Sequence, residues 1–61
     1  MIPYSEQLKE ARREIAKRER VYPRFVAERK MSQKEADHHL ELMRAIAGTL
    51  AELAKSEDLL R

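Results

Sequence analysis

The residues best suited to bind a metal ion are two neighbouring histidines, His38 and His39, and Glu35, three positions before His38. A Glu-x-x-His step places a carboxylate and an imidazole on one helix face, as in metal-binding helical bundles. Such a site also needs carboxylates from a facing helix, where the chain offers Glu14 but also Arg18, whose charge is unfavourable beside a metal. We therefore expect no metal and no other cofactor, with His39 hydrogen-bonded at the edge of the core and His38 in solvent.

A row of basic side chains follows the outer face of the first half of the chain. This basic ridge consists of Lys9, Arg13, Lys17, Arg20 and Arg24. At ~100° per residue its members fall within about 80° of one another, over a length of roughly 22 Å. A solvated helix face is the commoner meaning of such a row, because Glu6, Glu10 and Glu14 flank it and weaken its field. The alternative is a surface that binds nucleic acid or an acidic protein partner.

Arg18 lies in an apolar row between Ile15 and Tyr22, where a buried charge must be paired or must reach solvent. Its partner is expected to be Glu14, Glu35 or a carboxylate of a second chain. A polar residue at such a position can also fix the register of an assembly.

The second half of the chain carries a clear helix signal. Ser32 and Glu35 have the spacing of a capping box, so a helix is expected from Gln33 to about residue 55, with residues 56–61 fraying. Its apolar residues recur at alternating steps of four and three and form a stripe wider than one neighbouring helix needs, which implies a second neighbour. The candidate dimer interface on this stripe is Leu40, Met43, Ile46, Leu50 and Leu53.

The first half predicts a helix over residues 5–29, with Ser5 as its N-cap, and a turn over about 30–32. Its apolar row passes Pro23 without losing phase, which favours one continuous helix that bends where proline removes a backbone donor. The alternative is a short separate helix that begins at Pro23.

Length and composition predict a single all-α domain. The 61 residues include 39% charged residues, one glycine and two prolines, which is typical of helical proteins. Two helices of similar length joined by a tight turn predict an antiparallel helical hairpin. One layer of apolar side chains is a thin core for so short a chain, so we expect two hairpins to pair as a dimeric four-helix bundle.

Several function classes are not expected. The chain has no cysteine, no cationic-then-apolar leader and no apolar run near the ~20 residues of a membrane span, so we expect a cytoplasmic protein that does not cross a membrane. An enzyme is not expected either, because a slim hairpin without a Gly-rich loop offers little concavity in which catalytic groups could converge.

The segment ARREIAKRERVYPRFV, followed by KMSQKEADHHLELMRAI, resembles a group of small uncharacterised helical proteins encoded in bacterial and prophage genomes. The similarity covers residues 11–46, and its most specific part is VYP at 21–23 followed by MS at 31–32. The resemblance implies a bacterial or phage protein of the cytosol, and it brings no catalytic residue, cofactor or partner with it.

The expected function is therefore that of a non-enzymatic interaction protein that acts as a homodimer and binds another protein. The alternative is a nucleic-acid-binding accessory protein that uses the basic ridge. The two hypotheses differ in whether the ridge contacts phosphates.

Overall fold

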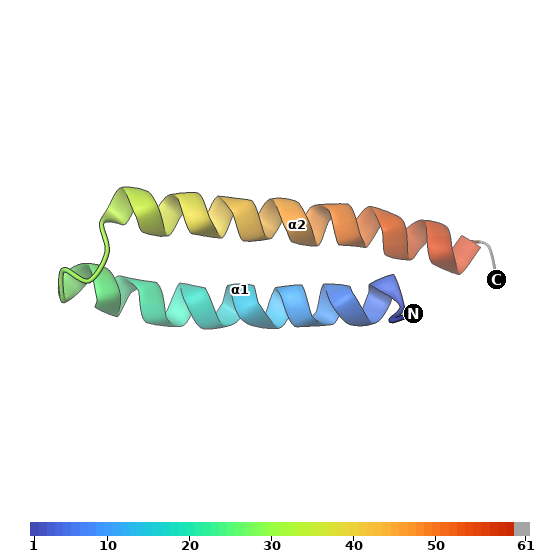
Figure 1. Cartoon of the computed structure of the whole chain (residues 1–61), viewed down its shortest axis with the longest axis horizontal. Coiled ribbons are helices and arrows are strands. Elements are labelled where there is room, and N and C mark those ends of the chain that lie inside the picture. Colours follow the sequence, from blue (N-terminus) through green and yellow to red (C-terminus); the bar gives the residue numbers. More distant parts are fainter. Residues whose placement is uncertain (60–61) are drawn as a thin grey trace.

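The chain folds into two long helices that lie side by side and antiparallel (Figure 1). The structure, a computed structural model, describes residues 1–59. Helix α1 spans Tyr4–Ala27 and helix α2 spans Gln33–Leu59. The molecule is a rod of 48 × 15 × 15 Å, with the turn at one end and the contact between Tyr4 and Glu57 at the other. The predicted all-α helical hairpin is confirmed.

Helix α1 ends earlier than the sequence predicted, in a Schellman motif. Arg29 adopts a left-handed conformation with φ of 58°, which stops the helix. The Arg29 N–H then donates to the Val26 carbonyl (3.1 Å), and the Lys30 N–H donates to the Phe25 carbonyl (2.8 Å). The connection therefore occupies residues 28–32 and is longer than the predicted turn.

Helix α2 begins with Ser32 as its N-cap, which is the N-cap half of the predicted capping box. The Ser32 hydroxyl accepts a hydrogen bond from the Glu35 N–H (3.0 Å) and donates one to Glu35 Oε1 (3.2 Å). The Glu35 N–H, in the first turn of α2, therefore has a hydrogen-bond acceptor in the residue that precedes the helix. At its other end α2 continues past the predicted end, so residues 56–59 are helical and not frayed. Residues 60–61 of the predicted frayed tail lie outside the described residues.

The start of α1 is held by a carboxylate from the end of α2. The N-cap position is taken by Pro3, with φ of −58°, and the predicted N-cap, Ser5, lies within the first helical turn. Pro3 has no side-chain oxygen to offer, and Glu57 Oε2 accepts a hydrogen bond from the Tyr4 N–H instead, at 3.3 Å. A negative charge is also favoured at a helix N-terminus. This contact stabilises the last turn of α2 in its helical form.

Helix α1 passes through Pro23 without a break, as the unbroken phase of its apolar row predicted. The alternative of a separate helix beginning at Pro23 is therefore wrong. The bend at this proline stays a prediction.

The seam between the helices is packed with small side chains. Within residues 1–59 the buried apolar residues are Leu8, Ala11, Ala36 and Ala54, and no large side chain is fully buried. Alanines let two helix backbones approach closely but bury little apolar area. The hairpin alone therefore has a thin core, and most of its larger apolar side chains remain partly or largely exposed.

The left-handed conformation of Arg29 generates a test of the turn. Because a Cβ atom is strained at this φ, Arg29→Gly should raise the free energy of unfolding by about 1 kcal/mol relative to Arg29→Ala. Both variants remove the same charge, so the alanine variant isolates the backbone effect. Urea unfolding followed by circular dichroism, at one fixed protein concentration, measures the difference. Equal stability of the two variants would show that the residue is not left-handed.

The contact between Glu57 and Tyr4 generates a second test. Glu57→Ala should lower the free energy of unfolding by roughly 0.5–1 kcal/mol, because it leaves the Tyr4 N–H at the start of α1 without its acceptor. Glu57→Gln, which keeps an oxygen acceptor, should lose less. Glu52→Ala removes an exposed carboxylate from the same helix and serves as the control. If Glu57→Ala and Glu52→Ala unfold alike in urea, the contact does not stabilise the hairpin.

Candidate interaction surfaces

Three large apolar side chains of α2 form a strip that α1 does not cover. Leu42, Ile46 and Leu53, called here the apolar strip, are 47%, 49% and 39% exposed. Ile46 and Leu53 belong to the predicted interface, whereas Leu42 was not included in it. Leu42 can be recognised in the sequence because it lies four residues before Ile46, which places both side chains on one helix face.

An open groove of about 580 Å³ lies beside the strip, between the two helices. Its apolar part includes Ile2, Met43 and Leu50, and the last two are half-buried members of the predicted interface. The α1 wall of the groove also carries carboxylates, those of Glu6, Glu10 and Glu14. The groove therefore joins an apolar α2 side to an acidic α1 side.

Leu40, the remaining predicted interface residue, lies on the other flank of the hairpin. It lines a groove with Tyr22 and is half-buried there. The same groove includes Arg44 and Glu19, whose side chains form an exposed ion pair across the two helices at 3.3 Å. The predicted interface is thus divided by the hairpin, because Leu40 faces one flank and Met43 and Leu50 line the groove on the other.

Arg18 is paired within its own helix. Its Nε donates to Glu14 Oε1 at 2.9 Å, and both side chains are partly buried, with exposures of 27% and 40%. This pair is the first of the partners expected from the sequence. It leaves the positive charge of Arg18 at the edge of the 580 Å³ groove that Glu14 lines.

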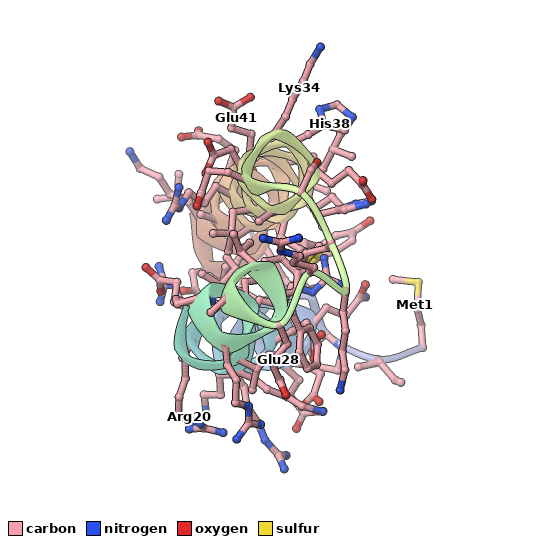
Figure 2. All side chains as sticks on the ribbon, turned by 90° about the vertical axis from the view of Figure 1, so that its left-hand side faces the viewer. Met1, Arg20, Glu28, Lys34, His38 and Glu41 are labelled. Atoms are coloured by element: carbon pink, nitrogen blue, oxygen red, sulfur yellow. The ribbon has the colours of Figure 1, made fainter. Side chains whose placement is uncertain are left out.

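The basic ridge lies on the face of α1 that is turned away from α2. All five of its side chains are exposed, and Figure 2 shows Arg20 pointing away from α2. Arg13 approaches Glu10 (3.8 Å) and Arg24 approaches Glu28 (4.0 Å). Across the described part of the chain, the ridge residues without an ion pair are Lys9, Lys17 and Arg20.

The two histidines are both exposed, and their ring centroids lie 5.9 Å apart. In Figure 2, His38 lies on the side of α2 opposite α1. His39 is therefore not at the edge of the core as predicted, because α1 covers a narrower part of α2 than the apolar stripe suggested. Glu35 accepts a hydrogen bond from Ser32, and no three His, Asp or Glu side chains gather as metal ligands among residues 1–59.

Comparison with known proteins adds no relative. No protein-family model matches the chain, and neither the curated proteins nor the solved structures give a significant match. In the part of the chain that the structure describes, neither helix is apolar over a length sufficient to span a membrane.

Proposed function

We propose that this chain is a non-enzymatic interaction module that acts as a homodimer, in which two hairpins form a four-helix bundle and bind another protein. The observation that carries the proposal is the apolar strip on a hairpin whose own seam buries one leucine and three alanines among residues 1–59. A contiguous exposed apolar surface is typical of a protein interaction site.

The surface area of the chain supports the same proposal. The accessible surface is 5007 Å², against about 4100 Å² for a compact monomer of this mass. The excess of about 900 Å² is close to the roughly 800 Å² that each partner buries in a stable interface. One second copy would thus bring the hairpin to the exposed area of an ordinary folded protein.

Two further parts of the proposal rest on the sequence. A bend of α1 at Pro23, where the helix lacks a backbone donor, would let α1 follow the curvature of a bundle. The resemblance to bacterial and prophage proteins supports a cytoplasmic setting.

The homodimer generates a test on α2. Light scattering should give twice the mass of the chain, and the thermal midpoint should rise with protein concentration. Ile46→Glu should raise the dimer dissociation constant roughly 100-fold or more, since it places an unpaired charge in the interface. Gly48→Glu adds the same side chain to α2 where nothing lies within 4 Å, and should leave the dimer intact.

A native chain that is a monomer at micromolar concentration, with a midpoint independent of concentration, would contradict the homodimer. If Ile46→Glu and Gly48→Glu associate equally well, the apolar strip is not the interface.

A second candidate function, nucleic-acid binding, is favoured by the exposure of the basic ridge opposite α2. Binding of duplex DNA should weaken with salt, with a log-log slope of about −0.9 for each phosphate contacted. Arg13→Glu with Lys17→Glu should remove most of the binding and spare the fold, because both side chains are exposed. Lys34→Glu with Lys55→Glu makes the same change in net charge on α2 and serves as the control. Absence of DNA and RNA binding at low ionic strength would exclude this function.

A further inference from the structure

We infer that a second copy of this chain covers the apolar strip with its own α2, in antiparallel orientation, so that Leu42 of each copy lies opposite Leu53 of the other. The inference rests on the homodimer proposed above and adds the pairing of the helices to it. Its support comes from the direction of the strip around α2, the helix dipoles of the bundle and the spacing of the leucines.

The direction of the strip fits a helix at the corner of a bundle. Ala36 and Ala54, which are buried in the seam, share one direction around the axis of α2. At ~100° per residue, the apolar strip points about 100° away from that direction. A helix at the corner of a four-helix bundle has two neighbours separated by about 90°. The strip therefore faces the position of the next helix, with α1 as the other neighbour.

In the second copy, the surface best suited to cover the apolar strip is its own α2. In the first half of α1, the groove side carries Gln7, Glu10 and Glu14, which are poor cover for leucine and isoleucine. The α2 helix of a second copy presents the same apolar strip to this one. Pairing the two strips buries apolar surface on both copies, and it also covers the groove residues Met43 and Leu50.

Two contacts between the helices show which parts of α1 and α2 lie level with each other. Tyr4 contacts Glu57 at one end, and Glu19 contacts Arg44 nearer the turn. Between these points the midpoint of the strip, which falls between residues 47 and 48, lies level with Glu14. A twofold axis at this midpoint therefore passes close to the middle of α1.

The helix dipoles favour antiparallel pairing about this axis. All neighbouring helices of the bundle are then antiparallel, which suits their dipoles. The carboxylates on the groove side of α1 do not select the orientation, because Glu14 lies level with the axis and therefore close to the partner's Glu14.

The spacing of the strip gives the register. Leu42 and Leu53 are equally far from the midpoint, and so are Ile46 and Thr49. Antiparallel pairing about the midpoint therefore places Leu42 opposite the partner's Leu53, and Ile46 opposite the partner's Thr49. The same register repeats on both sides of the axis, as a twofold interface requires.

Disulfide exchange can test this geometry directly, because the natural chain has no cysteine. Leu42→Cys and ¹⁵N-labelled Leu53→Cys are mixed in equal amounts and equilibrated in a glutathione buffer, and mass spectrometry separates the three disulfide dimers. The mixed disulfide should clearly exceed the half of all dimers that random pairing gives. Ile46→Cys with Thr49→Cys tests the same register with smaller losses from the strip, and Gly48→Cys on the outer face should give little cross-linking.

Each other outcome is informative. A dominant disulfide between two Leu42→Cys chains would mean parallel helices, and a random mixture would mean that the strips do not face each other. Either result overturns the antiparallel pairing while a dimer by light scattering keeps the proposed function. A native chain that is monomeric by light scattering overturns both.

Discussion

The packing of alanines along the seam is the interaction on which the rest of this structure depends. Ala11, Ala36 and Ala54 allow the two helices to approach closely, and Leu8 is the one large side chain buried with them among residues 1–59. Such a seam specifies how the helices align but buries little apolar area for the 59 residues that it orders. The ion pairs along the rod are mostly exposed and add little. The arrangement of the two helices is therefore well defined, but the hairpin buries little apolar surface. For this reason the apolar strip on α2 remains exposed.

Features of the fold that depend on neighbouring residues could be predicted from the sequence. The N-cap at Ser32 and the continuity of α1 through Pro23 are examples, because each follows from spacing within a few turns. The cap on Tyr4 could not be predicted, since its acceptor lies 53 residues away. The end of α1 was also missed, because a left-handed residue is usually glycine and here it is Arg29. Likewise, the candidate interface could be recognised as apolar, but the position of α1 decides that Leu40 lies on the other flank.

The candidate interaction surfaces of this molecule occupy separate sides. The basic ridge is on the outside of α1, while the apolar strip belongs to α2, so one surface can be covered while the other stays accessible. In the proposed antiparallel dimer, Glu14 would turn toward the partner, whereas Glu10 stays beside Arg13 of the ridge at 3.8 Å. Lys9, Arg13 and Arg20 would remain outside, and the assembled rod would present two basic faces. Assembly and binding of an acidic ligand would therefore be compatible.

The contact between Tyr4 and Glu57 also determines how the hairpin responds to force. Because α1 and α2 are joined at one end of the rod, tension applied to Tyr4 and Leu59 at the other end pulls the helices apart sideways. The load then falls on one pair of helical turns at a time, beginning with the hydrogen bond from Tyr4 to Glu57. A seam loaded in this direction opens progressively, like a zipper, at a much lower force than one sheared along its whole length. The hairpin is thus mechanically soft at its open end, even though its helices are long.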